Sequence, residues 1–135
     1  MSRGPGAIER AIARQIKADR ERQSEVLSRR MPVMVTSWSL VMELYRPAQD
    51  GWHWQPSRTQ RTSVVRAMHS FVRKHQQYAL MGGNGRKELM IYDTDDPVSV
   101  AGARLFVASR NRPSMMDVRS FMEREAERDA FSQAP

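Results

Sequence analysis

The chain has 135 residues, a length that allows one domain with one modest hydrophobic core. Hydrophobic residues make up 40% and charged residues 27% of the sequence, which indicates a globular rather than a disordered protein. The absence of cysteine excludes disulfides, thiolate zinc sites and thiol catalysis, and it predicts a reducing, cytoplasmic environment. The sequence contains neither an apolar run of the ~20 residues that a transmembrane helix needs nor a signal-peptide core, so we expect no membrane partner and no export.

Positive charge is concentrated in the first two thirds of the chain. The balance of 22 Lys and Arg against 15 Asp and Glu gives a net charge of +7. Basic residues outnumber acidic ones up to residue 92, whereas acidic residues are in the majority over residues 93–135. A field of this sign attracts polyanions, and nucleic acid is the first candidate.

The first predicted helix lies within residues 7–28. An apolar ladder at i, i+4 spacing marks one of its faces and contains Ile8, Ile12 and Ile16. The stretch that follows this ladder is entirely polar, so the helix either continues into solvent or ends near Asp19.

A short strand and a second helix are predicted next. Residues 31–35 are apolar and partly β-branched, and Pro32 restricts this strand to the edge of a sheet. Thr36 or Ser37 offers an N-cap for the following helix, which Pro47 ends. The residues that share its apolar face are Leu40, Val41, Leu44 and Tyr45.

A loop rich in Pro, Gly and Trp over residues 46–56 precedes the third predicted helix. That helix begins near Ser57 or Thr59 and runs to about His75. Its apolar members recur at helical spacing and are Val64, Ala67, Met68, Phe71 and Val72. Two short strands then flank the turn GGNGRK, whose Asn-Gly pair supplies the positive φ angles of a tight hairpin.

Two further helices are predicted after the hairpin. An Asp-Pro pair, typical of an N-cap followed by a first-turn proline, favours a helix over residues 97–109, although the β-branched content there leaves a strand open. Ser114 and Asp117 form a capping-box pattern at the start of a last helix over residues 115–131. The apolar stripe of this last helix contains Val118, Phe121 and Met122.

The polar face of the third predicted helix carries the main functional signal. Residues 57–77 contain no carboxylate, so the i, i+4 Glu–Lys pairs of an ordinary solvated helix cannot form there. The residue types on this face are Arg, Gln, Thr, Ser and His, which donate to phosphates or reach base edges. A solvated helix is the alternative interpretation, and the lack of acidic partners favours nucleic-acid binding over it.

The order of elements up to residue 93 is helix, strand, helix, loop, helix, strand, turn, strand. Over residues 6–93 this order resembles a winged helix-turn-helix domain, and the resemblance rests on the segments VTSWSLVMELY, RTQRTSVVRAMHSFVRKH and YALMGGNGRKELMIYD. The long, Trp-rich connection before the third helix departs from the tight turn typical of such domains. The implied fold class is α+β, mostly α, with a two- or three-stranded sheet and a C-terminal helical extension over residues 94–135.

The resemblance implies that the third helix enters the DNA major groove and that the hairpin tip contacts the backbone. The residues expected to read base edges are Thr59, Gln60, Thr62, Ser63 and Arg66. The expected phosphate partners are Arg58, Arg61, Arg73 and Lys74. The remaining expected DNA contacts are His69 and Ser70 on the helix and Asn84, Arg86 and Lys87 at the hairpin tip.

The other chemistry-bearing residues give weaker signals. Trp38, Trp52 and Trp54 are predicted to be core or loop-pinning residues, with base stacking as the alternative. No His residues combine with carboxylates at metal-ligand spacing, and no catalytic constellation is recognisable. We therefore expect no metal, no cofactor, no small-molecule ligand and no enzymatic activity.

The sequence thus predicts a cytoplasmic, nucleoid-associated protein that binds double-stranded DNA sequence-specifically. The expected role is transcriptional regulation or replication and maintenance in a bacterial, plasmid or phage setting, and dimerisation through the last helix is a further hypothesis. Two alternatives stay open. One is a winged-helix module that binds proteins, and the other is a binder of RNA or single strands that uses Trp52 and Trp54.

Overall fold

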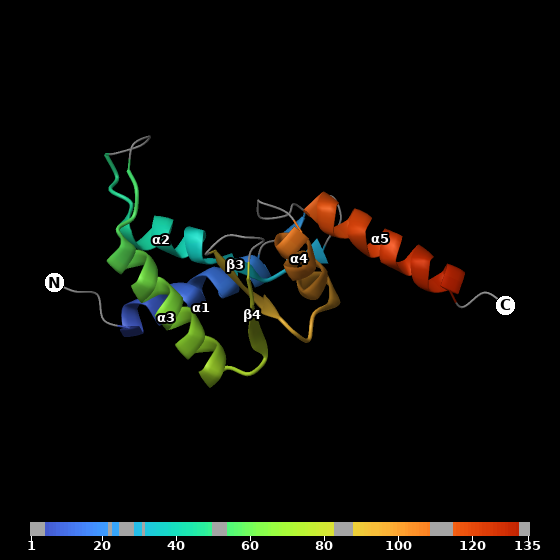
Figure 1. Ribbon diagram of the computed structural model, residues 1–135, viewed down its shortest axis with the longest axis horizontal. Coiled ribbons are helices and arrows are strands. Elements are labelled where there is room, and N and C mark those ends of the chain that lie inside the picture. Colours follow the sequence, from blue (N-terminus) through green and yellow to red (C-terminus); the bar gives the residue numbers. More distant parts are fainter. Residues whose placement is uncertain are drawn as a thin grey trace.

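The computed structural model describes residues 5–21, 23–24, 29–30, 32–49, 54–82, 88–108 and 115–132. The helices within these residues are α1 (Pro5–Glu21), α2 (Ser37–Tyr45), α3 (Arg58–Lys74), α4 (Pro97–Ala108) and α5 (Met115–Ser132) (Figure 1). The strands are β1 (Gln23–Ser24), β2 (Arg29–Arg30), β3 (Met34–Thr36), β4 (Tyr78–Gly82) and β5 (Leu89–Asp93). The predicted fold class, α+β with mostly helix and a small sheet, is confirmed.

Local sequence explains where α2 and α3 begin. The Thr36 hydroxyl accepts a hydrogen bond from the Ser39 N–H at 3.0 Å, and the Ser39 hydroxyl accepts from the Thr36 N–H at 3.2 Å. Ser57 and Gln60 form the same reciprocal capping box at the start of α3. These side chains satisfy N–H groups that the first turn of a helix leaves without partners. The predicted starts of both helices are confirmed, and α1 ends at Glu21, close to the earlier of its two predicted ends.

The main sheet has three antiparallel strands in the order β3–β5–β4. Val35 of β3 and Leu80 of β4 both lie opposite Ile91 of the central strand, on its two sides. β3 is an edge strand, as the proline before it predicted. β1 and β2 form a separate antiparallel pair.

Alternate side chains of the main sheet point into two different cores. The side chains that join α1, α2 and α3 in the first core are those of Val33, Val35, Leu80, Leu89 and Ile91. The side chains that join α4 and α5 in the second core are those of Met34, Met81, Met90 and Tyr92. Figure 1 shows the two groups of helices on opposite sides of the sheet.

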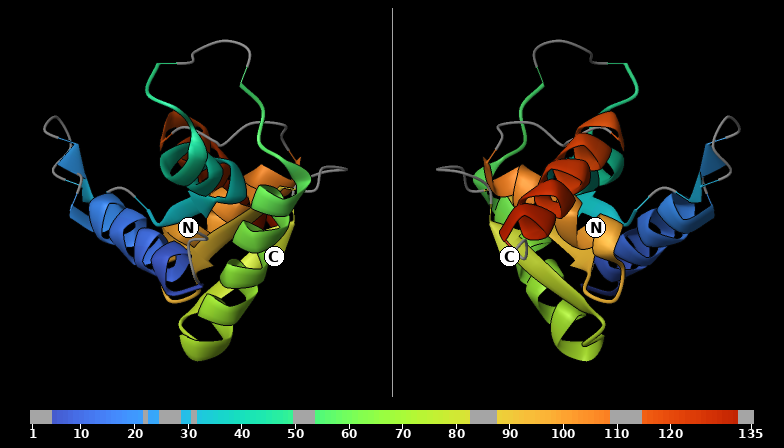
Figure 2. Two further views of the ribbon diagram at one scale, coloured as in Figure 1. Left: turned by 90° about the vertical axis from the view of Figure 1, so that its left-hand side faces the viewer. Right: turned by 90° about the vertical axis from the view of Figure 1, so that its right-hand side faces the viewer.

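The first core is built mainly by the helices. α1, α2 and α3 contact one another, and Figure 2 shows this three-helix group from the end of the molecule. The apolar positions predicted for these helices are buried, namely Ile8, Ile12, Ile16, Leu40, Val41, Leu44, Val64, Ala67, Met68 and Phe71. Tyr45 and Val72 are partly buried at the border of this core. The predicted apolar faces of the three helices are therefore confirmed.

Residues 97–108 form the helix α4, so the alternative of a strand in this region is wrong. α4 covers the second face of the sheet, and its approach to β3 is so close that a Cβ at Gly102 would overlap the sulfur of Met34. Val118 anchors α5 in the same core, and Arg104 pairs with Glu125 at 3.1 Å. The predicted C-terminal extension thus shares a core with the sheet, while α5 extends away from it (Figure 1).

Candidate nucleic-acid interface

The helix α3 is fixed by its buried stripe and by both of its ends. Val64 and Met68 are fully buried, and Phe71 is almost so. At the C-terminal end the His75 N–H donates to the Phe71 carbonyl at 2.9 Å, and the two rings lie 4.4 Å apart. A helix held on one side in this way presents its other side in a defined orientation, and that side divides into regions with different surroundings.

One region, which we call the groove flank, consists of Arg58, Arg61, Thr62, Val65 and Arg66. It lines an open cavity of about 700 Å³ between α2, α3 and Glu88, the residue before β5. The other residues of the lining are Ser37, Trp38, Val41 and Glu88. The three arginines are exposed, and no ion pair joins any of them to another residue that the structure describes. Their guanidinium groups are free to form forked contacts with phosphates or base edges.

A second region, the α1 flank, consists of Ser70 and Lys74. The Lys74 ammonium lies 3.1 and 3.2 Å from the two carboxylate oxygens of Glu9 on α1. A hydrogen bond from the Ser70 hydroxyl lowers the pKa of Glu9 most, and the hydrogen bond and charge of Lys74 lower it further against the opposing effect of burial. Ser70 and Lys74 were both expected to contact DNA. In the structure both interact with the carboxylate of Glu9 on α1.

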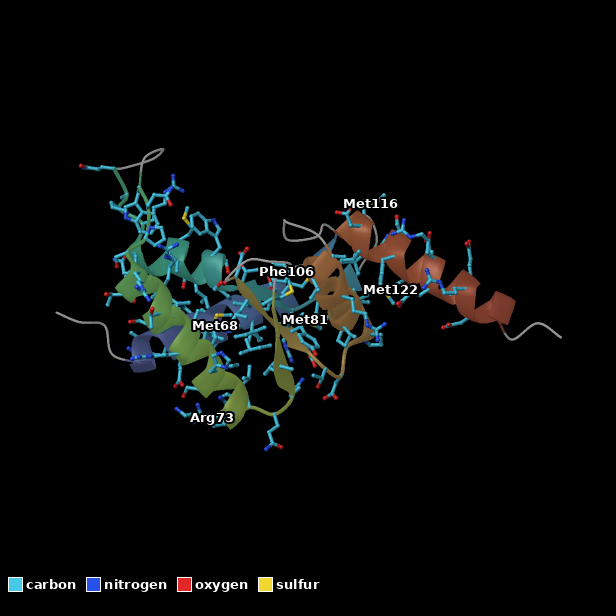
Figure 3. All side chains as sticks on the ribbon, viewed as in Figure 1. Met68, Arg73, Met81, Phe106, Met116 and Met122 are labelled. Carbon is cyan, nitrogen blue, oxygen red and sulfur yellow. The ribbon has the colours of Figure 1, made fainter. Side chains whose placement is uncertain are left out.

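The other predicted contacts on α3 differ in exposure. Thr59, His69 and Arg73 are exposed, whereas Ser63 is partly buried. Figure 3 shows Arg73 projecting from the C-terminal part of α3, with Met68 on the side that faces the domain. Gln60 was expected to read bases, but its side-chain carbonyl accepts the Ser57 N–H at 2.9 Å and closes the helix cap. The residues predicted at the hairpin tip, Asn84, Arg86 and Lys87, lie outside the described part of the chain.

The three tryptophans occupy different settings. Trp54 is partly buried against the first core, in agreement with the expected loop-pinning role. Trp38 is 46% exposed, so the expectation that it is a core residue is wrong. The reason is its place on α2, because the buried arc of that helix is formed by Ser37, Leu40, Val41 and Leu44 and Trp38 falls beside it. Trp52 lies outside the residues that the structure describes.

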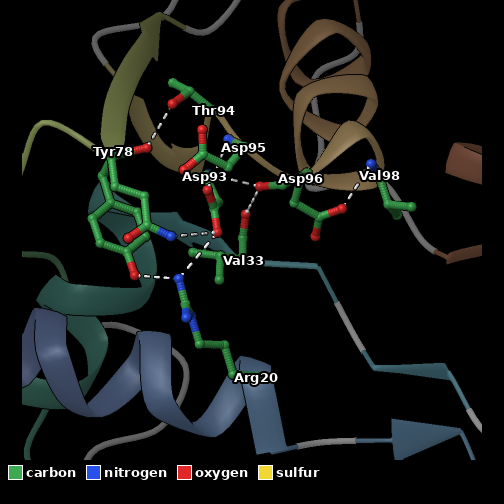
Figure 4. A network of polar contacts seen from close by, with 10 residues as sticks. Arg20, Val33, Tyr78, Asp93, Thr94, Asp95, Asp96 and Val98 are labelled. Atoms are coloured by element: carbon green, nitrogen blue, oxygen red, sulfur yellow. Dashed lines mark hydrogen bonds and ion pairs between the residues drawn. The ribbon is translucent and has the colours of Figure 1, made fainter.

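A polar network at the base of the hairpin was missed by sequence reasoning. Asp93, the last residue of β5, is only 7% exposed. Its carboxylate accepts hydrogen bonds from Arg20 of α1 at 3.0 Å, from Gln77 at 3.1 Å and from the Asp95 N–H at 2.9 Å (Figure 4). Arg20 also donates to the hydroxyl of Tyr78, and burial raises the pKa of that phenol.

The same network reaches α4 through a serine. The Asp93 N–H donates to the Ser99 hydroxyl at 2.8 Å, and this hydroxyl donates to the Val33 carbonyl at 2.6 Å. The network thus fixes the base of the β4–β5 hairpin to α1 on one side and to α4 on the other. The sequence does contain one signal for this network, namely a carboxylate, Asp93, directly at the end of an apolar strand. A carboxylate that is buried with such a strand needs hydrogen-bond or ion-pair partners.

Within the described ranges, no group of three or more His, Cys, Asp or Glu side chains could hold a metal ion. None of the described helices combines the length and the apolar character needed to cross a membrane. No protein-family model matches the chain, and no curated protein or solved structure is significantly similar to it. Function is therefore inferred from the geometry and charge of α3 and its surroundings.

Proposed function

We propose that the protein binds double-stranded DNA, without catalysing a reaction, through the exposed face of α3. The observation that carries this proposal is the set of exposed arginines at positions 58, 61, 66 and 73, which lack ion pairs within the described residues. Cationic side chains without internal partners on one helical face suit the phosphates that flank a major groove. Thr59, Thr62 and His69 share this face and supply short polar groups for base edges.

The arrangement around α3 supports a winged helix-turn-helix mode of binding. The helix directly precedes the β4–β5 hairpin, and the hairpin joins β3 in one three-stranded sheet. In this mode α3 lies in the major groove while the hairpin tip contacts the neighbouring backbone. The base of the hairpin is held to α1 by the Arg20–Asp93 ion pair at 3.0 Å, and α1 also packs against α3.

A role in transcriptional regulation or in replication and maintenance, at the nucleoid of a bacterial, plasmid or phage system, follows by analogy. We further propose that two copies associate through the C-terminal helices, since two half-sites lengthen the sequence that is read. Met116 on α5 is 70% exposed and Val107 on α4 is 37% exposed, and both are apolar. Sedimentation equilibrium of the full chain, with and without Met116→Lys, tests this association.

Selection of bound duplexes from a random pool, at two salt concentrations, tests the main proposal. We expect an enriched sequence whose affinity falls steeply as salt rises, because bound arginines release counterions from DNA. Single strands of the enriched sequence serve as the control. Equal affinity for single strands and duplex, or duplex binding that is independent of salt, would contradict duplex recognition by α3.

A further inference from the structure

The open cavity beside α3, which we call the groove, is lined by both charged and apolar side chains, whereas a DNA backbone offers mainly phosphate charge. Its lining combines three guanidinium groups, from Arg58, Arg61 and Arg66, with one carboxylate, from Glu88. The excess of cationic groups favours an anionic ligand. The same lining also contains the exposed side chain of Trp38 and the partly buried side chain of Val65, so an anion without an apolar part would leave those two groups in water.

Trp38 gives this groove a flat aromatic wall. The residue lies in the first turn of α2, beside the buried arc that contains Val41, and it is 46% exposed. Large exposed aromatic side chains next to cationic groups are typical of surfaces on which a planar ring stacks. The arginines of α3 line the same groove as Trp38, and Arg58, Arg61 and Val65 recur at i, i+3 and i+7 along one flank of that helix.

The size of the groove agrees with a small ligand. A volume of about 700 Å³ falls within the range of about 300–1,000 Å³ that is usual for sites that enclose small molecules. The groove residues come from α2, from α3 and from Glu88 directly before β5, and only the packing of these segments brings them together, so the sequence does not indicate this site. A ligand that satisfies the whole lining has a planar ring at one end and several negative charges at the other.

We propose that this groove binds a phosphorylated nucleoside, with the base on Trp38 and the phosphates on Arg58, Arg61 and Arg66. The ligand is either a free nucleoside triphosphate or an unpaired nucleotide of a single strand, which share this chemistry. The proposal goes beyond duplex binding and does not depend on it. If both hold, the free nucleotide and the duplex compete, because the arginines of the groove flank belong to both surfaces.

Calorimetric titration of the full chain at low salt tests the proposal. The probes are adenosine triphosphate, inorganic triphosphate and a short oligodeoxyadenylate, and poly-glutamate serves as a polyanion without rings. We expect Trp38→Ala to weaken nucleotide binding about tenfold, because stacking on an aromatic side chain is lost. Trp38→Phe keeps a ring and retains most of the affinity. Arg10→Ala is the matched control, because Arg10 is exposed on α1 and lies outside both the groove lining and the face of α3 proposed to bind DNA.

The outcomes separate the sources of the ligand. Binding of adenosine triphosphate that depends on Trp38 supports a free nucleotide, and Trp38-dependent binding of the oligonucleotide alone supports a nucleotide within a strand. Failure of both to bind overturns the proposal. Equal binding of inorganic triphosphate or poly-glutamate, unaffected by Trp38→Ala, also overturns it. A duplex titration of Trp38→Ala keeps the two proposals distinguishable, since we expect its duplex affinity to change less than about twofold.

Discussion

On the groove flank of α3 three arginines face an open cavity, whereas on the α1 flank Lys74 lies 3.1 Å from the carboxylate of Glu9. Both flanks belong to one helix without an acidic residue. The two partners of the second flank are 65 positions apart in the chain, so their contact arises only when α1 packs against α3. The comparison shows that a basic helix is not uniformly available to a ligand, and that the folded surroundings decide which cations remain free.

The two flanks also differ in the free energy that a bound phosphate would gain from their cationic groups. An anion at the groove flank meets guanidinium groups that form no ion pair with described residues, so their full charge is available. An anion at Lys74 must compete with Glu9 for the ammonium. An exposed ion pair of this kind contributes about 0.2–1 kcal/mol to stability, which is enough to reduce the net gain from one phosphate contact.

The largest expected effect is on stability, and it follows from a substitution in the buried stripe of α3, which supports both flanks. Met68 lies on the inward face of α3 and is fully buried, so Met68→Ala is expected to leave a cavity and to lower the free energy of unfolding by about 2–5 kcal/mol. Urea denaturation followed by circular dichroism measures this loss. DNA affinity per folded molecule stays unchanged, because Met68 touches neither flank's outer surface. A stability loss below about 1 kcal/mol would show that Met68 does not hold α3.

Substitution of a single cation on each flank separates them directly. Arg66→Ala is expected to weaken duplex binding by about 1–3 kcal/mol, because an exposed arginine without a described ion pair contacts the DNA. Lys74→Ala removes the same charge from the same helix and is expected to weaken binding by less than about 1 kcal/mol. Fluorescence anisotropy with the selected duplex gives both values. Equal losses in the two variants would contradict the distinction between the flanks.

The salt dependence of binding tests whether arginines of the groove flank contact DNA phosphates. Arg58→Ala is expected to lower the slope of log affinity against log salt by about one, because one fewer phosphate is neutralised. The same plot for Lys74→Ala is expected to keep nearly the wild-type slope. Titrations at four or more salt concentrations measure these slopes, and an unchanged slope in Arg58→Ala would remove that residue from the phosphate contacts.

The α1 flank gives the smallest effect, and it depends on pH. The pKa of Glu9 in the folded protein lies below its ordinary value of 4.5, so its contribution to stability is complete above pH 4.5. That contribution is lost as the pH falls from 4.5 through the folded-state pKa. Glu9→Gln is therefore expected to cost about 0.2–1 kcal/mol at pH 7 and nothing once Glu9 is protonated. Denaturation of both proteins across this range measures the difference, and a difference that persists in acid would rule out the ionised carboxylate as its cause.

Much of the fold could be predicted from short-range patterns. The starts of α2 and α3 depend on capping pairs three residues apart, Thr36 with Ser39 and Ser57 with Gln60. The inward faces of the helices depend on apolar residues at helical spacing, and the edge position of β3 depends on a proline. These signals lie within one element each, so they can be recognised before the elements are packed together.

The features that sequence reasoning missed all depend on packing between distant segments. Glu9 reaches α3 from the first helix, and Asp93 joins Arg20 of α1 to the hairpin across 73 positions. Trp38 is exposed because α2 turns Leu40, Val41 and Leu44 toward the first core. The groove exists only because α2, α3 and β5 meet. Such contacts define the candidate site more than the residue types on α3 do.

A nuclear magnetic resonance titration of the isotope-labelled protein with the selected duplex tests the central claim most directly. Binding through the exposed face of α3 predicts that amide shifts change most at Arg58, Thr62 and Arg66. It predicts only small changes at Glu9 on α1 and along the outer part of α5. A pattern of shifts centred on α5 or on the α1 flank, with the first half of α3 unaffected, would contradict the account.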